Sequence, residues 1–426
     1  GYNYSAKSDK GFTIEPNDLI VKVDQPKAVF TQVLFEPNQK LNDSLSYDIT
    51  AWALPLAYGV EGYALKNSLG FKTKATIEVN EKTVPQKVYA FHVPWNNRIS
   101  AQVLSLLHQN NIKVRSAMNK AIFGDVTVEP GGLLVTKADN PNVVDFEKTI
   151  SDLVKIKTDY NYINTGFSSN AKDVGSENFN LLKAPKVVLL SGKGVSSTEF
   201  GAAWFYMQET IDYPVSVVEV NNFNRLKLMD YNTLILADGN YTFSEEQQKK
   251  IGEWIKNGGK VIAMNGALSL FDGKEGYALS PFASDEDKLN SEKENDSIAL
   301  KERFLDFHDS ERREISKSIP GAIIENVLNK THPLSFGLGD KYFSLKTDSN
   351  HYSLLKNAVN VAYVPKDYKS YGFIGSQVKK KLNNTVSFAV EHKGDGTIVY
   401  MVDNPLFRGF WENGNVLFSN ALFLVN

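Results

Sequence analysis

The stretch that decides the fold is DYNTLILADG, residues 230–239, in which an apolar run from Leu234 to Ala237 ends at Asp-Gly. A short apolar run bounded by turn residues is typical of a strand buried on both faces of a sheet. Similar runs alternate with helical stretches, and we expect strands at 186–190, 215–220, 233–237 and 260–264, with helices around 199–210 and 244–257. This alternation predicts an α/β fold with a doubly wound, mostly parallel sheet.

The same region continues to the end of the sequence as one predicted domain, residues 185–426. It is interrupted at about residues 273–320, where charged residues crowd and apolar residues thin out, so we interpret this part as a charged surface insertion. The sheet is expected to resume at 360–364, 386–390 and 397–402, with a hairpin turn at 393–396 and a final helix over 415–423.

Residues 86–184 have the pattern of a smaller α/β domain. We expect strands at 88–93 and 112–114, helices at 97–107 and 145–156, a hairpin at 126–135 that turns at Pro130-Gly131-Gly132, and a polar loop or linker over 161–180. This unit would precede the large sheet as a domain of its own.

Residues 1–85 are predicted to form a β-rich segment or linker. Short apolar runs at 20–23 and 29–35 are broken by Pro, Asn and Asp, as strands and their turns often are. The stretch SYDITAWALPLAYGV, residues 46–60, is dense in aromatic and small residues. We expect it to be buried, because large aromatic side chains mostly serve cores and interfaces.

Composition excludes several classes of function. The 426 residues are enough for two to four domains. The chain has no cysteine, which excludes disulfides, thiolate zinc sites and cysteine nucleophiles together. Its net charge of −2 gives no reason to expect nucleic acid as a partner, and the absence of a long apolar run predicts no membrane span.

One spacing is compatible with a metal site. His308 and Glu311 form an HxxE pair, which places both side chains on one face of a helix. The pair lies inside the charged insertion, where a dry, well-supported metal site is not expected. We interpret it as a solvated surface helix and predict no metal and no cofactor in this chain.

The turn after the strand at 260–264 is the place where a nucleophile would stand in this kind of sheet. Ligands and catalytic groups gather at the carboxyl ends of parallel strands, and a nucleophile elbow needs Cys or Ser on a sharp turn. Asn265 and Gly266 occupy this position and supply the turn without a nucleophile.

A Gly- and Ser-rich loop follows the strand at 186–190, with Ser191, Gly192, Gly194 and Ser196 as its candidate binding residues. Backbone N–H groups ahead of a helix can hold an anion. The pattern of a phosphate-binding P-loop is absent, so capping of the next helix is the alternative.

Further candidates follow other predicted strands. Arg408, Trp411 and Glu412 combine charge with aromatic rings, which suits either a carboxylate ligand or a locked loop. Asp238 and Gly239 end the strand at 233–237, while His92 and Trp95 end the strand at 88–93. If Asp238, Arg408 and Glu412 converge, they could form an acid–base site of a hydrolase without cysteine.

The segments 186–190, 230–239 and 258–263 resemble the class I glutamine amidotransferase fold, in its divergent branch fused to other domains. The resemblance implies a flavodoxin-like sheet over residues 185–426. It also implies a catalytic cysteine at Asn265 or Gly266 and a His-x-Glu pair near residues 403–406, and neither is present. The family's activity is therefore not expected here.

A second resemblance covers most of the chain. The segments 47–55, 130–132, 407–411 and 420–423 are similar, in order, to the region that follows the peptidase domain in large bacterial zinc carboxypeptidase-like proteins. The resemblance implies a secreted or periplasmic parent whose zinc and catalytic residues lie in a peptidase domain ahead of this region. His308 and Glu311 are in the wrong domain to be those ligands.

Together these observations favour a non-catalytic accessory region that supports the peptidase domain of the same polypeptide or binds its peptide substrate. Two alternatives stay open, namely a module that binds a small anion or a peptide carboxylate, and a hydrolase with a non-cysteine site at the strand ends.

Overall fold

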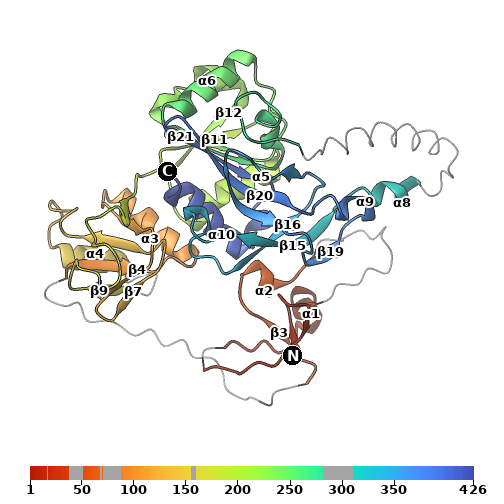
Figure 1. Cartoon of the computed structure of the whole chain (residues 1–426), viewed down its shortest axis with the longest axis horizontal. Helices are drawn as coiled ribbons and strands as arrows, with labels where there is room; N and C mark the ends of the chain where they lie inside the picture. Colours follow the sequence, from red (N-terminus) through yellow and green to blue (C-terminus); the bar gives the residue numbers. More distant parts are fainter. Residues whose placement is uncertain (17, 38–50, 68–69, 71–87, 155–159, 282–309) are drawn as a thin grey trace.

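A computed structural model describes residues 1–16, 18–37, 51–67, 70, 88–154, 160–281 and 310–426. The first part of the aromatic stretch, residues 46–50, and most of the charged insertion lie outside the described residues. An eleven-stranded sheet forms the centre of the molecule, with the smaller α/β unit beside it and the N-terminal segment below (Figure 1).

The parallel half of this sheet has the doubly wound topology that the sequence predicted. Its strands lie in the order β12 (Val215–Glu219), β11 (Val187–Ser191), β13 (Thr233–Leu236), β14 (Lys260–Met264) and β21 (Gly396–Met401), and all neighbours are parallel. By order along the chain this is 2-1-3-4-5, the flavodoxin-like arrangement. The predicted fold class is confirmed.

Residues alternate between two cores along each parallel strand, as the pleat requires. Val187 and Leu189 of β11 belong to one hydrophobic cluster, whereas Val188 and Leu190 belong to another. The first is covered by α5 (Ser197–Phe205) with its continuation η1 (Tyr206–Thr210), and by α10 (Glu412–Ser419) with η8 (Asn420–Leu424). The second is covered by α6 (Glu245–Lys256), which begins at a capping box formed by Ser244 and Gln247.

The sheet continues beyond β21 in an antiparallel half. β20 (Thr385–Lys393) forms the predicted hairpin with β21, in which Lys393 pairs with Gly396. Beyond it lie strands of which only β18 was predicted, namely β18 (Val359–Val364), β15 (Gly321–Leu328) and β16 (Lys341–Lys346), with β17 (Tyr352–Ser353) and β19 (Ser370–Phe373) at the side. Short helices also follow the strands of both halves of the sheet. Those after parallel strands are η2 (Val220–Arg225), η3 (Leu228–Asp230), η4 (Asn265–Leu270) and η7 (Phe407–Gly409), and those of the antiparallel half are α8 (Ser310–Ile315), η6 (Pro333–Ser335) and α9 (Ser376–Lys379).

The smaller unit is an antiparallel five-stranded sheet with two helices. Its strands lie in the order β10 (Phe179–Leu181), β5 (Arg115–Ala117), β8 (Leu133–Thr136), β4 (Ala90–Val93) and β9 (Asn161–Ile163), and its helices are α3 (Arg98–Gln109) and α4 (Phe146–Val154).

Three predictions for this unit are wrong. No strand forms at 112–114, because the strand in this part of the chain, β5, begins at Arg115. The segment 126–135 is not a hairpin, because β7 (Val126–Val128) pairs back with β6 (Ala121–Phe123) while β8 pairs with β4 and β5. Gly131 at φ 89° redirects the chain there and packs closely on Trp95. The polar stretch 161–180 is not only a loop, since it contributes both edge strands, β9 and most of β10.

The N-terminal segment differs from the predicted run of strands. Its strands are β1 (Tyr2–Asn3), β2 (Ser8–Asp9) and β3 (Tyr63–Ala64), which form a small three-stranded sheet. The apolar run at 20–23 is not a strand, and the run at 29–35 lies mostly in helix α1 (Ala28–Leu34). Residues 51–57, which include α2 (Leu54–Ala57), are largely buried as predicted.

One buried carboxamide joins the smaller unit to the large sheet. Asn420 is fully buried, and its Oδ1 accepts a hydrogen bond of 2.5 Å from Trp95 Nε1. Its Nδ2 donates to the carbonyl oxygens of Leu334 and Phe336 at 2.9 and 2.7 Å. Close approach is possible because Gly337 has no side chain, since a Cβ there would overlap the carbonyl oxygen of Trp95.

A partly buried lysine fixes the C-terminal helix to the sheet. Lys260 at the start of β14 donates from Nζ to the carbonyl oxygens of Leu422 and Val425 at 2.8 and 2.7 Å.

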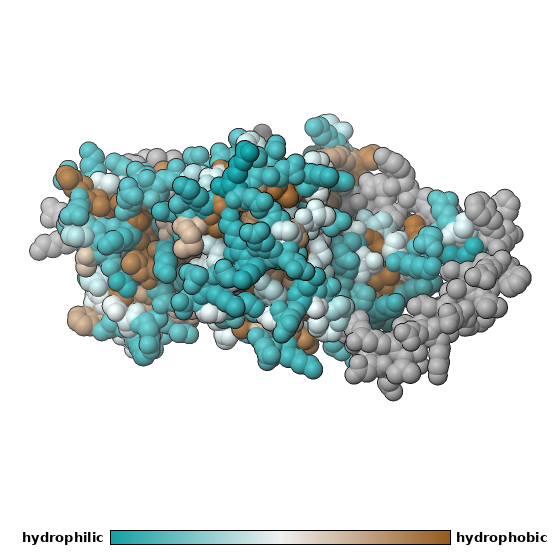
Figure 2. Space-filling model, turned by 90° about the horizontal axis from the view of Figure 1, so that it is seen from above, coloured by the Kyte–Doolittle hydropathy of each residue, from teal (hydrophilic) through white to brown (hydrophobic). Residues whose placement is uncertain are grey.

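Hydrophilic residues cover most of the face seen in Figure 2, with apolar ones scattered between them. Within the described residues, no helix has the length and apolarity needed to cross a membrane.

We predict that Asn420→Ala lowers the free energy of unfolding by about 2–4 kcal/mol, because it leaves one buried N–H and two buried carbonyl groups without their partner. Thermal unfolding followed by circular dichroism measures this effect. Asn240→Ala, at an exposed asparagine, is the matched control and should change little. Equal melting temperatures for both variants would contradict the role given to Asn420.

Candidate functional site

The candidate site lies at the carboxyl ends of the parallel strands, around the turn that follows β14. Asn265 begins this turn at φ 47°, a left-handed conformation that is uncommon for residues other than glycine. The residue is buried, with a relative exposure of 8%. The turn therefore keeps the sharp geometry of a nucleophile elbow, with a carboxamide where a nucleophile would stand.

The carboxamide of Asn265 is only half satisfied. Its Nδ2 donates to Asp348 Oδ2 at 3.2 Å. Its Oδ1 is buried and has no hydrogen-bond partner among the described residues. An unpaired buried acceptor is costly, so this oxygen is a place where a donor would be favoured.

Gly266 ties the elbow to the end of β13. Its backbone N–H donates to Asp238 Oδ1 at 2.8 Å, and a Cβ at this position would lie 2.6 Å from the same oxygen. The loop after β11 is held against the same segment, because Ser196 N donates to Asp238 O at 2.9 Å and Asn240 N donates to Gly194 O at 2.7 Å. Two strand-end loops thus meet at Asp238.

Glu199 brings a second carboxyl group to this place. It stands in the first turn of α5, which Ser196 caps by accepting from Glu199 N at 3.4 Å. Its carboxylate accepts a hydrogen bond from Asn404 Nδ2, at the end of β21. Burial, together with the charge of Asp238, raises the pKa of Glu199 to about 7, although Arg408 acts in the opposite direction.

Lys346 neutralises the carboxylates on the other side of the elbow. Its buried Nζ lies 3.1 Å from Asp403 Oδ1 and 3.2 Å from Asp348 Oδ1. Burial by itself would lower the pKa of Lys346, but the two carboxylates outweigh it and hold the pKa above its usual value.

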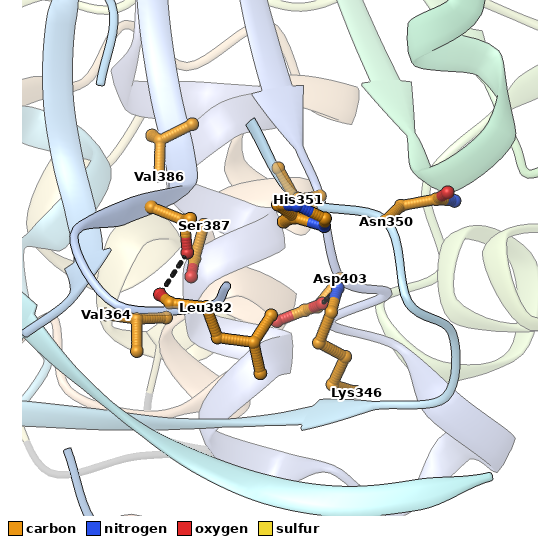
Figure 3. A pocket seen from close by; sticks show the side chains of 10 residues that line it. Lys346, Asn350, His351, Val364, Leu382, Val386, Ser387 and Asp403 are labelled. Carbon is orange, nitrogen blue, oxygen red and sulfur yellow. Dashed lines mark hydrogen bonds and ion pairs between the residues drawn. The ribbon is translucent and has the colours of Figure 1, made fainter. Parts of the chain in front are cut away.

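A small cavity opens beside this ion pair. Figure 3 shows Lys346, His351 and Asp403 gathered around it. About 10 Å³ is open to the centre of a water molecule, which is room for one water, and Asn265, Asp238 and Glu199 do not line this cavity.

These contacts form a path around the turn, which we call the elbow ring. Asn404, bonded to Glu199, follows Asp403, and the path continues through Lys346 and Asp348 to the elbow and Asp238. It closes between Asp238 and Glu199, whose charges act on each other. The members of the ring are Glu199, Asp238, Asn265, Gly266, Lys346, Asp348, Asp403 and Asn404.

The predicted trio of Asp238, Arg408 and Glu412 is not brought together. Asp238 belongs to the elbow ring, and the exposed Arg408 is near enough to Glu199 to affect its pKa. Glu412 instead pairs with Arg98 of the smaller unit at 3.1 Å, and no hydrogen bond or ion pair between described residues joins it to Asp238. Glu199, which was not among the predicted candidates, is the carboxyl group whose charge interacts with that of Asp238.

Three aromatic or imidazole candidates turn out to be core residues. Trp411 is 1% exposed and donates from Nε1 to Phe343 O at 2.9 Å. Trp95 makes the bond to Asn420 described above. His92 is buried with neither ring nitrogen paired among the described residues, and burial lowers its pKa to about 4, so its ring is neutral.

The loop candidates Ser191, Gly192, Gly194 and Ser196 have mainly local roles. Gly192 and Gly194 take positive φ values of 91° and 87°, and Ser196 caps α5. Gly239 bridges to Val195. The backbone N–H groups of Val195 and Ser196 are used inside the protein, where they donate to Gly192 O and Asp238 O.

The described residues contain no group of His, Asp and Glu that could hold a metal ion. His308 lies outside them, and Glu311 is an exposed residue of α8.

Sequence reasoning missed several ring members. Lys346 ends a strand that was not predicted and Asp348 follows it, so nothing placed them near the elbow. Glu199 and Asn404 could have been found, because each closely follows a predicted parallel strand and such ends meet at one edge.

Comparison with known proteins adds little to this description. No protein-family model and no curated protein matches the chain. Among solved structures, a ThuA-like protein from Parabacteroides merdae is similar at 13% identity over 56% of this chain and 89% of its own, with a TM-score of 0.36.

A ThuA-like protein from Bacteroides uniformis is similar at 10% identity over 57% of this chain and 92% of its own, with a TM-score of 0.33. A protein described as part of a GMP synthase, from Thermoplasma acidophilum, is similar at 10% identity over 56% of this chain and 94% of its own, with a TM-score of 0.32. The assignment of an amidotransferase-like α/β fold rests on the strand order of the chain itself.

We predict that Glu199→Gln stabilises the protein at pH 8 by about 1–3 kcal/mol, since the neutral amide avoids a buried charge and keeps an acceptor for Asn404. The folded pKa of Glu199, about 7, lies above its ordinary value of 4.5. The native state therefore holds a proton that the unfolded chain loses between these values, and wild-type stability falls as the pH rises through this window.

Melting temperatures of wild type and Glu199→Gln between pH 4 and pH 8 check this prediction. The variant should gain on the wild type as the pH rises and show no gain from this source near pH 4. Glu275→Gln, at an exposed glutamate, is the control. A difference between wild type and Glu199→Gln that does not change with pH would contradict a raised pKa.

Proposed function

We propose that this chain is a non-catalytic accessory region that binds a ligand at the elbow ring. The observation that carries the proposal is Asn265, which occupies the elbow with its amide nitrogen bound to Asp348. A carboxamide in this position is not a nucleophile, and the chain has no cysteine to replace it. The elbow keeps the shape of a reactive turn without the group that would react.

The other positions of an amidotransferase triad support the same proposal. Asp403 and Asn404 stand where the resemblance implies a His-x-Glu pair. Asp403 is buried in an ion pair with Lys346, and Asn404 is bonded to Glu199. Neither is arranged to take a proton from a nucleophile at residue 265, because both are already paired with other groups.

We further infer the context of this region from its resemblance to zinc carboxypeptidase-like proteins. In this proposal a zinc peptidase domain in the same polypeptide performs hydrolysis, outside the cell or in the periplasm. The present region would support that domain or present its peptide substrate. The paired contacts at Trp95 and Asn420 would make it a rigid body suited to this role.

A hydrolase with a non-cysteine site is the second candidate. It is favoured by Glu199, a carboxyl group whose pKa of about 7 suits general acid–base work, next to the carboxylate of Asp238. Catalysis would then need a water molecule as nucleophile, without help from a metal site in the described residues. The anion-binding alternative is less favoured, because carboxylates outnumber cationic groups at the elbow ring.

We predict that this chain alone does not release C-terminal residues from a peptide panel, with or without added zinc. Hydrolysis should appear only when a zinc carboxypeptidase-type domain precedes the region in one polypeptide. Mass spectrometry of the peptides provides the measurement. Turnover by the chain alone that Glu199→Gln abolishes and Glu275→Gln leaves intact would overturn the proposal in favour of the second candidate.

A further inference from the structure

We propose that the elbow ring is a binding site for a primary ammonium group. This inference rests on the proposed function, because it names the chemical class of ligand for the same site. It uses the unpaired acceptor of Asn265, the carboxylates of Glu199 and Asp238, and the balance of charge around them.

The first observation is the unsatisfied carboxamide of Asn265. Its nitrogen is fixed on Asp348, so the planar amide directs Oδ1 away from that residue. Oδ1 is buried without a partner in the described part of the chain, and Asn265 is 8% exposed. A buried carbonyl oxygen with free lone pairs favours a ligand that donates a hydrogen bond.

The second observation is the distribution of charge. Asp348 and Asp403 share a single cation, Lys346, which is buried between them. The carboxylate of Asp238 accepts from a neutral group, the backbone N–H of Gly266, and Glu199 accepts from the neutral amide of Asn404.

Arg408 is the nearby cation on the side of Glu199, and its side chain lies over the Phe407 ring at 5.0 Å. The four carboxyl groups of the ring therefore face two cations, Lys346 and Arg408. Lys346 forms ion pairs with both of its carboxylates, whereas no ion pair among the described residues joins the exposed Arg408 to Glu199 or Asp238. A cationic ligand would therefore be favoured at Glu199 and Asp238.

An ammonium group fits these demands better than a hydroxyl group or an anion. It carries one positive charge and three donors, which is one donor for each of the three acceptor groups named above. A hydroxyl group donates once and brings no charge. An anion would face the carboxylates of Glu199 and Asp238 directly.

The same geometry makes binding dependent on pH. The groups that act on Glu199 are Asp238 from the end of β13, Arg408 from η7 and the neutral Asn404 from the end of β21. A bound cation favours the ionised carboxylate, so it lowers the pKa of Glu199 and releases its proton. Affinity for an amine should therefore rise between about pH 6 and pH 8, as long as the amine itself stays protonated.

Three probes distinguish the sources from which such a group could come. They are N-acetyl-lysine methylamide for a peptide lysine, glucosamine for an amino sugar, and putrescine for a polyamine. Each is compared with its fully N-acetylated form, which keeps the carbon skeleton and removes the charge. Isothermal titration calorimetry in two buffers with different ionisation enthalpies gives the affinity and the proton release together.

We expect at least one amine to bind and its acetylated form to bind at least about tenfold more weakly, because charge-assisted hydrogen bonds are lost. Glu199→Gln and Asp238→Asn should each weaken amine binding to a similar extent, and Glu199→Gln should also remove proton release near pH 7. Glu275→Gln should bind like the wild type, and melting temperatures show that each variant is folded.

The inference is overturned if no amine binds, if the acetylated probes bind equally well, or if both ring variants bind like the wild type. Those outcomes leave a non-catalytic accessory role intact. Turnover of peptides by the chain alone would instead remove the proposed function, whatever the amines do, so the two failures are distinguishable.

Discussion

The hydrogen bonds of Asn420 are the constraint on which the arrangement of the two α/β units depends. A single fully buried carboxamide meets Trp95 from the end of β4 and the carbonyl groups of Leu334 and Phe336 beside η6. Three segments from distant parts of the sequence therefore share one polar centre. Because both polar atoms of this side chain have their partners there, Asn420 can be buried in the core without an unpaired group.

The elbow ring depends on how its carboxylates are compensated by cations and by neutral hydrogen-bond donors. Its cation, Lys346, is buried between Asp403 and Asp348, and this pairing allows two carboxylates to approach the elbow, Asp348 from the antiparallel half of the sheet and Asp403 from the end of the parallel strand β21. Asp238 and Glu199 approach from the parallel half, where their hydrogen bonds come from a neutral backbone N–H and a neutral amide. The difference explains why burial raises the pKa of Glu199 while Lys346 stays charged.

The parallel half of the sheet could be predicted from sequence because its signal is local. Each strand from β11 to β14 is a short apolar run followed by turn residues, and α6 carries its own capping box. The hairpin predicted at 126–135 was wrong because a Pro-Gly-Gly sequence indicates a turn but does not indicate which strands pair on either side of it. The strand predicted in the run 29–35 was wrong because a short apolar segment with β-branched residues can form a helix as well as a strand.

For the candidate site, the position of Asn265 at the elbow could be predicted from the strand that precedes it, and Glu199 could have been found by the same reasoning. Lys346 and Asp348 were not, because their strand became visible only through its pairing with β15.

The pairing of β14 with β21 has a consequence for the way this protein is made. Ile262 lies opposite Val399, and the whole antiparallel half is encoded between them. On a ribosome, the first four parallel strands are synthesised while the edge of β14 still has nothing beside it. An unpaired, strongly apolar edge is a template for aggregation. We therefore expect folding in the cell to require that the edge of β14 stays covered until the final hairpin, β20 with β21, has been synthesised.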